Sequence, residues 1–137
     1  MDVLVDTDVL INTLRKKPDR GCIDFLRHIE SGDISGYLSV LTVFELYYGA
    51  YLSDNPTKNI KPVNELLSIF SILDLSLDTC KHSGQVGAGL CVDGAGIDFR
   101  DLLIGVTARQ LNMVLVSYNL KHFSRINGLR VKKPDEI

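Results

Sequence analysis

The chain has few histidine and cysteine residues, three of each, and they form no repeated pair at zinc-ligand spacing. Its three histidines, His28, His82 and His122, are scattered along 137 residues, whereas zinc sites use histidine and cysteine at short spacing. Residues 82–96 carry five glycines, but neither G-x-G-x-x-G nor G-x-x-x-x-G-K-[ST] occurs, so no phosphate-binding loop is indicated. We therefore expect no zinc site, and we expect these glycines to serve close helix packing and a turn before Asp98.

Strong charge of one sign and long hydrophobic runs are also missing. The formal net charge is −2 and the pI is about 5.9, so the composition gives no general sign of nucleic-acid binding, although local basic patches remain open. No apolar run approaches the roughly 20 residues of a membrane span. The three cysteines, Cys22, Cys80 and Cys91, are widely spaced. We expect reduced core thiols and a cytoplasmic protein, with no export signal and no membrane contact.

The apolar patterns alternate between strand and helix along the whole chain. This alternation favours an α/β fold with a parallel sheet, and 137 residues suit one domain over residues 1–137. The expected strands are residues 1–6, 34–38, 72–75, 113–117 and 129–131. The expected helices are residues 8–17, 18–31, 39–52 with Ser39 as its N-cap, 63–70, and one beginning near Asp101, with a loop at 53–57.

Three acidic residues lie at or within strongly apolar segments, where a carboxylate is costly. Asp6 follows the short strand of residues 3–5, at the end where open α/β sheets place their ligands. Glu45 is almost the only charge in residues 38–52, which we expect to form a helix buried on all sides. Asp101 precedes another apolar helix. If the fold brings the three together, they form an anionic pocket.

Each acid also has an ordinary structural interpretation. Asp101 can cap its helix, Asp6 can end a strand and start a turn, and Glu45 can pair with a lysine or arginine. The coincidence of three such acids in one small chain argues against three separate explanations. Carboxylates that converge without enough basic partners favour a hard cation, and Mg²⁺ and Mn²⁺ prefer oxygen ligands.

At this point four segments resemble, in order, the motifs of the PIN-domain ribonucleases, and most closely the VapC-type toxins. The first motif's leading Asp corresponds to Asp6, the second motif's Glu to Glu45, and the third motif's Asp to Asp101. The third is the most specific, because it keeps the family's spacing between glycine, isoleucine and aspartate. The four segments are residues 3–11, 39–46, 90–108 and 115–129.

The fourth motif departs from the family pattern. Ser117 stands where the family commonly has Thr, which keeps the hydroxyl, and Asn119 stands where a fourth acid is often found. Asn119 offers a carbonyl oxygen without charge, so we expect it to orient water or substrate. Asp98 is a candidate for the compensating acid. Asp8, where the family often has Ser or Asn, is interpreted as the N-cap of the first helix.

The resemblance implies a three-layer α/β/α PIN-like domain with a mainly parallel central sheet of about four to five strands. It implies a metal-dependent endoribonuclease, the toxin of a type II toxin–antitoxin pair. Asp6, Glu45 and Asp101 would act in catalysis with Ser117 and Asn119. The same three acids, together with Asp98, would hold Mg²⁺ or Mn²⁺. The implied partners are RNA, a cognate antitoxin that often places a basic side chain in the acidic pocket, and a second copy in a homodimer.

The RNA would be single-stranded or looped, because duplex RNA hides its bases in a narrow groove. Tyr47, Tyr48 and Tyr51 lie at helical spacing beside Glu45, where core packing or a subunit interface is favoured over base stacking. Ordinary solvated surface is an equal interpretation for each basic residue near the motifs. These candidates for RNA backbone contacts are Arg15, Lys16, Lys17, Arg20, Lys121, His122 and Arg125.

Two other functions are compatible with parts of this pattern. Asp6-Thr7-Asp8 is similar to the nucleophile motif of haloacid-dehalogenase phosphotransferases, but the chain is short and shows no suitable downstream lysine followed by a paired acidic motif. A catalytically silent PIN-like domain that binds RNA or protein is the other alternative. Asn119 is the only residue that favours it.

Overall fold

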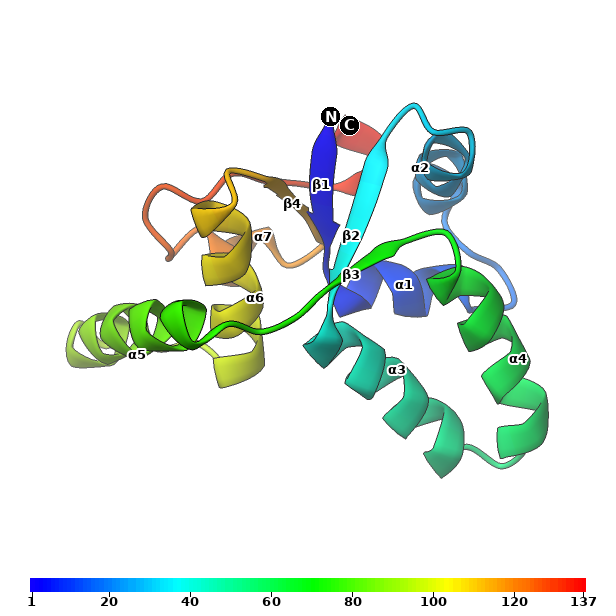
Figure 1. Cartoon of the computed structure of the whole chain (residues 1–137), viewed down its shortest axis with the longest axis horizontal. Helices are drawn as coiled ribbons and strands as arrows, with labels where there is room; N and C mark the ends of the chain where they lie inside the picture. The colour runs from blue at the N-terminus through cyan, green and yellow to red at the C-terminus, as the bar shows by residue number, and fades with distance from the viewer.

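The computed structural model describes residues 1–137 and contains one five-stranded sheet in which all neighbouring strands are parallel. The strand order is β3-β2-β1-β4-β5, so β1 lies at the centre (Figure 1). The predicted α/β class with a parallel sheet is confirmed. The strands are β1 (Asp2–Val5), β2 (Ser35–Ser39), β3 (Ser71–Leu73), β4 (Val114–Val116) and β5 (Val131–Lys132).

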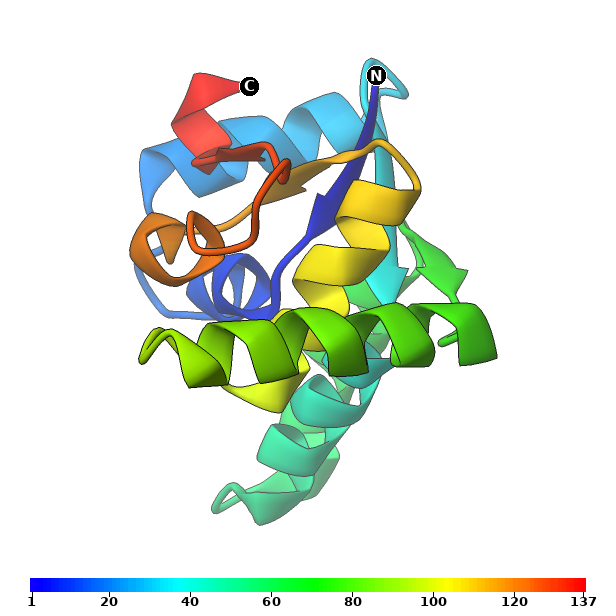
Figure 2. The same cartoon turned by 90° about the vertical axis from the view of Figure 1, so that its left-hand side faces the viewer.

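Helices cover both faces of the sheet and give three layers. Helices α1 to α4 pack in the cluster that contains Val3 and Val5, whereas α6 and α7 pack in the cluster that contains Leu4. Helix α5 lies outside α6, across the front of the view in Figure 2. The helices are α1 (Thr7–Thr13), α2 (Arg20–Glu30), α3 (Val40–Leu52), α4 (Pro56–Leu67), α5 (Leu77–Val92), α6 (Phe99–Gln110) and α7 (Leu120–Phe123).

The central strands explain why their sequence is apolar without alternation. Successive side chains of a strand point to opposite faces, and here both faces are covered. Leu4 pairs in register with Leu115, and Val5 with Val116. All four side chains are fully buried. A strand buried on both sides has no position for a polar residue until it ends, which is where Asp6 stands.

The first two helices are shorter than predicted. The helix expected at residues 8–17 ends at Thr13, so residues 15–17 lie in a bend rather than in its last turn. Asn12 fixes this bend, because its side chain accepts from the Asp19 backbone N–H at 2.9 Å and donates to the Asp19 carboxylate at 3.0 Å. Pro18 disfavours a helical residue before it. The next helix therefore starts at Arg20 and not at Pro18.

Helix α3 is not buried on all sides, so that prediction was wrong. Its predicted N-cap is confirmed, because the Ser39 hydroxyl accepts from the Leu41 backbone N–H at 3.1 Å. Only one side faces the core, and the opposite side is an apolar surface in contact with solvent. The buried residues are Thr42, Leu46 and Ala50, whereas Phe44, Tyr48, Tyr51 and Leu52 are exposed.

The middle of the chain contains more helix than predicted. Helix α4 begins at Pro56, with Asn55 as its N-cap, so the loop expected at 53–57 is shorter and the helix expected at 63–70 starts earlier. Proline at the first helical position suits this start, because its missing N–H has no partner there. Strand β3 covers Ser71–Leu73 rather than 72–75, and the last strand begins at Val131 rather than at 129.

The glycine-rich stretch lies largely inside α5. The expected close packing is confirmed at Gly87, where a Cβ would stand 2.5 Å from the Leu102 Cδ2 atom, and the expected turn is confirmed at Gly94, whose φ is +71°. The expectation of close packing is wrong for Gly84 and Gly89, where a Cβ would meet nothing within 4 Å. These two glycines leave the helix surface open.

The cysteine prediction holds only in part. Cys22 is a buried free thiol, whereas Cys80 and Cys91 are free and exposed. The apolar neighbours of the last two lie in α5, a helix that packs mainly on α6 and so exposes much of its surface. None of the helices has both the length and the apolar character required to cross a membrane.

Candidate active site

Asp6 and Ser117 meet at the carboxyl edge of the sheet, directly after the neighbouring strands β1 and β4. The Asp6 backbone N–H donates to the Val116 carbonyl at 2.9 Å. The Ser117 hydroxyl donates to Asp6 Oδ2 at 2.8 Å, and the Thr7 backbone N–H donates to Asp6 Oδ1 at 2.8 Å. Asp6 is only 5% exposed. It therefore caps α1 and enters the site with a fixed orientation.

Asp8 lies in the same place and is not the N-cap that the sequence predicted. The strand ends at Val5 and the helix begins at Thr7, so the cap is Asp6. Asp8 Oδ2 instead accepts from the Tyr118 backbone N–H at 3.1 Å and from the Ser117 hydroxyl at 3.3 Å. Its Oδ1 atom is buried without a hydrogen-bond partner. Asp8 is a site residue that sequence reasoning missed.

Glu45 reaches the site from the first half of α3. Its Oε1 atom accepts from the Thr7 hydroxyl at 3.0 Å, and Thr7 Oγ1 also lies 3.0 Å from Thr42 Oγ1. Its Oε2 atom lies 3.8 Å from Arg100 Nη1, and the Glu45 side chain is 25% exposed. The alternative that Glu45 pairs with a basic residue is therefore present in the structure, although the contact is long.

Asp101 stands in the first turn of α6, but it does not cap that helix. The N-cap is Asp98, whose Oδ1 accepts from the Arg100 backbone N–H at 2.9 Å and from Arg100 Nε at 3.1 Å. Asp101 is thus left free of the capping role and stays half-buried. Asp98 has both a cap and an ion pair, and these contacts hold its pKa below the usual value.

Burial disfavours the charged form of three carboxylates at this edge, Asp6, Asp8 and Asp101. Burial raises the pKa of Asp6 to about 7, and the negative charge of Asp8 adds to the effect. Burial is also the main cause that raises the pKa of Asp8. The pKa of Asp101 is raised by burial, and then by the charges of Asp98 and Glu45. A cation would relieve this accumulation of negative charge.

Asn119 follows Ser117 at the start of α7. Its backbone N–H donates to the Ser117 hydroxyl oxygen at 2.9 Å, and its side-chain Nδ2 lies 2.9 Å from His122 Nδ1. The Ser117 hydroxyl thus links the backbone of the turn to the Asp6 carboxylate. The structure brings Asn119 and Ser117 to the same edge as Asp6.

The site has oxygen ligands but no complete cage of protein ligands. No three or more His, Cys, Asp or Glu side chains are gathered closely enough to hold a metal ion. The chemistry of the donor set nevertheless fits a hard cation, because it consists of carboxylates and hydroxyls, and Asp8 Oδ1 is a buried oxygen in need of a partner. Mg²⁺ in particular keeps several waters and commonly takes only one or two carboxylates from a protein.

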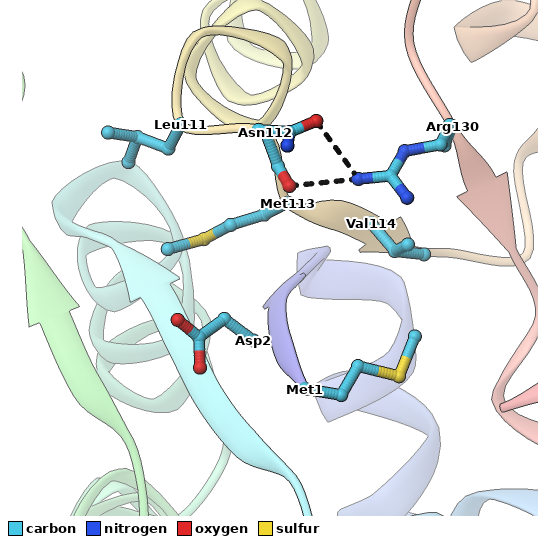
Figure 3. A pocket seen from close by; sticks show the side chains of 7 residues that line it. All are labelled: Met1, Asp2, Leu111, Asn112, Met113, Val114 and Arg130. Atoms are coloured by element: carbon cyan, nitrogen blue, oxygen red, sulfur yellow. Dashed lines mark hydrogen bonds between the residues drawn. The ribbon is translucent and has the colours of Figure 1, made fainter.

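Two cavities frame this edge and the opposite edge of the sheet. One of about 450 Å³ opens beside Glu45 between α1, α3 and α4, with Ile11, Leu46 and Val63 in its wall. The other, of about 370 Å³, lies at the amino ends of β1 and β4, where Arg130 donates to both oxygens of Asn112 (Figure 3). The parallel strands separate this second cavity from Asp6 and Asp101.

Comparisons with known proteins agree with this architecture. The family model for the PIN domain matches residues 3–129. Ribonuclease VapC2 of Haemophilus influenzae is 33% identical over 129 residues, which cover 94% of this chain and 95% of that protein. The tRNA(fMet)-specific endonuclease VapC of Shigella flexneri is 30% identical over the same shares of each chain.

Solved structures show the same fold. The VapBC2 structure from Rickettsia felis, bound to a DNA fragment from the promoter, matches with a TM-score of 0.87 and 27% identity, and covers 97% of this chain and 98% of that chain. DNA-bound VapBC from Salmonella typhimurium matches with a TM-score of 0.86 and 29% identity over 98% of both chains. These matches are to PIN-domain proteins along nearly the whole chain, and they contradict the haloacid-dehalogenase alternative. The chain belongs to the PIN-domain family and, within it, to the VapC ribonuclease toxins of VapBC toxin–antitoxin systems.

Proposed function

We propose that this ribonuclease hydrolyses RNA at the sheet edge where Asp6, Glu45 and Asp101 stand, with Mg²⁺ or Mn²⁺ as cofactor. The observation that carries the proposal is the approach of carboxylates from the end of β1, from α3 and from α6 at one sheet edge, where burial first and neighbouring negative charge second raise the pKa of both Asp6 and Asp101. Crowded carboxylates of this kind mark functional sites.

The cation would be held by the oxygens of Asp6, Glu45 and Asp101. When bound, it would supply a nucleophilic water at neutral pH and stabilise the charge that develops on the phosphate. Asp98 is the least available of the four predicted ligands, because Arg100 already occupies its Oδ1 atom. Asp8 offers an unpartnered oxygen next to Asp6.

The neighbouring residues would hold this arrangement during the reaction. Ser117 donates to Asp6 and keeps one carboxylate oxygen directed along the sheet edge. Thr7 does the same for Glu45. Asn119, once released from His122, would orient the attacking water or a ribose hydroxyl, since its amide can both donate and accept.

The substrate class that we propose is transfer RNA, cut in a single-stranded or looped region. The Shigella flexneri relative is named for action on tRNA(fMet). A loop displays its bases and its backbone, whereas a duplex presents mainly its shape. An exposed phosphate of such a loop would meet the carboxylates at the sheet edge without opening of a duplex.

We further propose a cognate antitoxin that occupies the cavity beside Glu45. VapBC structures from Rickettsia felis and Salmonella typhimurium contain relatives of this chain. The cavity joins apolar walls from α1, α3 and α4 to the side chains of Glu45 and Arg15, which suits an amphipathic segment that directs one basic residue toward Glu45. Such a segment would block the site sterically and also neutralise its charge.

A homodimer is proposed through the exposed aromatic side of α3. Phe44, Tyr48 and Tyr51 are each more than half exposed, and the Phe44 and Tyr48 rings stack at 5.6 Å. Contiguous exposed aromatic side chains usually mark interaction surfaces. The free thiols suit the reducing cytoplasm.

The experiment that tests the proposal is cleavage of total cellular RNA by purified protein with Mg²⁺, with Mn²⁺ and with EDTA. Discrete transfer-RNA fragments that require the metal are expected. Asp101→Asn should remove them while far-UV circular dichroism stays unchanged. Cleavage that persists in EDTA, or in folded Asp101→Asn, would contradict the proposed site. A folded, antitoxin-free protein that cuts no RNA under any condition would favour the silent scaffold.

A further inference from the structure

Arg100 is an arginine that forms ion pairs with two acids at the site, Asp98 and Glu45. Its Nε atom donates to Asp98 Oδ1 at 3.1 Å, and its Nη1 atom lies 3.8 Å from Glu45 Oε2. The charge of Asp101 also acts on it. Of the lysines and arginines, it is the only one that forms an ion pair with any of the predicted site acids.

The contacts of Arg100 are unequal. The bond to Asp98 has hydrogen-bond geometry, and Asp98 also caps α6 through the Arg100 backbone N–H. The approach to Glu45 is too long for a hydrogen bond. The guanidinium carbon lies 5.8 Å from the centre of the Phe99 ring, and the side chain is 46% exposed. Arg100 is thus fixed at Nε, while its two Nη groups make no hydrogen bond.

A guanidinium held in this way supplies the positive charge that an acidic site requires to bind RNA. A pocket of carboxylates repels the RNA backbone, so a cation beside it lowers the cost of approach. Arginine offers parallel N–H donors that match two oxygens of one phosphate. If Arg100 served only to neutralise Glu45, a direct hydrogen bond between them would be expected.

We propose that Arg100 binds a backbone phosphate of the RNA substrate at the mouth of the site, and that Asp98 is the positioning residue that orients its guanidinium. This inference rests on the proposed cleavage site at Asp6, Glu45 and Asp101. The Nη groups exchange their loose approach to Glu45 for the phosphate, which leaves the Glu45 carboxylate free. The Asp98 contact at Nε is retained.

The test compares Arg100→Gln and Arg100→Lys with the unchanged protein. Binding of fluorescently labelled total bacterial transfer RNA is measured by anisotropy across a salt series, in the Asp101→Asn background so that the RNA stays intact. Arg100→Gln should weaken binding about tenfold and lower the slope of log K against log salt by about 0.7, the value for one phosphate contact in a single strand. Arg100→Lys should recover the salt slope but not the full affinity, because lysine keeps the positive charge but lacks the paired N–H donors of the guanidinium group.

Cleavage and metal binding complete the test. In the protein with Asp101 intact, Arg100→Gln should raise KM more than it lowers kcat, and Mn²⁺ affinity measured by calorimetry should not fall. Arg27→Gln is the matched control, because Arg27 also pairs with one aspartate, Asp24, on an exposed helix surface outside the site. It should change neither the slope nor KM.

Three results would overturn the proposal. An unchanged salt slope in folded Arg100→Gln would show that the guanidinium does not meet a phosphate. A gain in both Mn²⁺ affinity and cleavage would show that Arg100 is only a counter-ion of Glu45. Failure of the unchanged protein to cut transfer RNA counts against the proposed function as well. Wild-type cleavage is therefore measured first, so that a failure of the proposed function is told apart from a failure of the Arg100 proposal.

Discussion

Asp8 and Tyr118, which are 110 residues apart in the sequence, meet at the candidate active site. Asp8 Oδ2 accepts from the Tyr118 backbone N–H at 3.1 Å, and so ties the start of α1 to the turn between β4 and α7. The same oxygen lies 3.3 Å from the Ser117 hydroxyl, which donates to Asp6. Asp8 therefore holds the turn that carries Ser117 and Asn119 against the central strand.

This relationship predicts different outcomes for two substitutions of Asp8. Asp8→Ala removes the acceptor of the Tyr118 N–H and should lower the free energy of unfolding by about 1–2 kcal/mol. Asp8→Asn keeps a carbonyl oxygen for that N–H and removes a charge next to Asp6. It should be at least as stable as the unchanged protein in urea denaturation at neutral pH with EDTA. Equal losses for both variants would show that charge, rather than the turn, explains the role of Asp8.

The raised pKa of Asp6 predicts a pH dependence of stability in the absence of metal. Folding raises the Asp6 pKa from 3.8 to about 7, so between these values the folded state binds more protons than the unfolded state. As far as this group is concerned, stability should therefore be highest below about pH 3.8, fall as pH rises from there to about 7, and level off above that value. The melting temperature measured with EDTA from pH 5 to 8.5 checks the sign.

Asp6→Asn is the control for that profile. An amide does not titrate, so the fall between pH 5 and 8.5 should become shallower. The residual slope would belong mainly to Asp8 and Asp101, whose pKa values are also raised. Added Mn²⁺ should oppose the fall in the unchanged protein, because a cation that binds only the folded state stabilises it by mass action. A profile that is flat without metal would contradict the burial of the Asp6 charge.

Loss of one carboxylate charge should separate site acids from surface acids. Asp101→Asn should reduce RNA cleavage by about 100-fold or more, because the electrostatic arrangement at the developing charge is lost. Asp54→Asn removes the same charge from the exposed loop after α3 and should leave the rate within about twofold. The rate constants are measured on the same transfer RNA with saturating Mn²⁺. Similar losses in both variants would point to a general charge effect and not to a ligand.

Sequence reasoning found the residues whose chemistry conflicts with their surroundings. Asp6 and Asp101 stand out because each adjoins a segment that is apolar throughout, and the structure brings both to one sheet edge. Asp8 was not identified, because its position fits a helix cap equally well. Whether Asp6 or Asp8 caps α1 depends on where β1 ends. Because β1 ends at Val5 and α1 begins at Thr7, the N-cap is Asp6.

Other features depended on contacts between distant segments. The approach of Arg100, in the first turn of α6, to Glu45 in α3 joins residues 55 positions apart, which no local pattern encodes. The exposure of Phe44 and Tyr48 could not be read from a helix that is apolar all round, because hydropathy does not state which side meets the sheet. The same limit explains why Cys80 and Cys91 were expected in the core.

The packing of α6 on the segment after α7 gives a last prediction, for the stability of the scaffold. A Cβ at Gly105 would lie 2.5 Å from the Ile126 Cδ1 atom and 3.3 Å from the Phe123 Cδ1 atom. Gly105→Ala should therefore cost about 1–3 kcal/mol through overpacking. Gly84→Ala is the matched control in α5, where a Cβ meets nothing within 4 Å, and it should instead add about 0.5–1 kcal/mol through helix propensity. Urea denaturation measures both. A stabilising Gly105→Ala would show that Ile126 moves aside easily, and that α6, with Asp101 in its first turn, is held by looser contacts than the structure indicates.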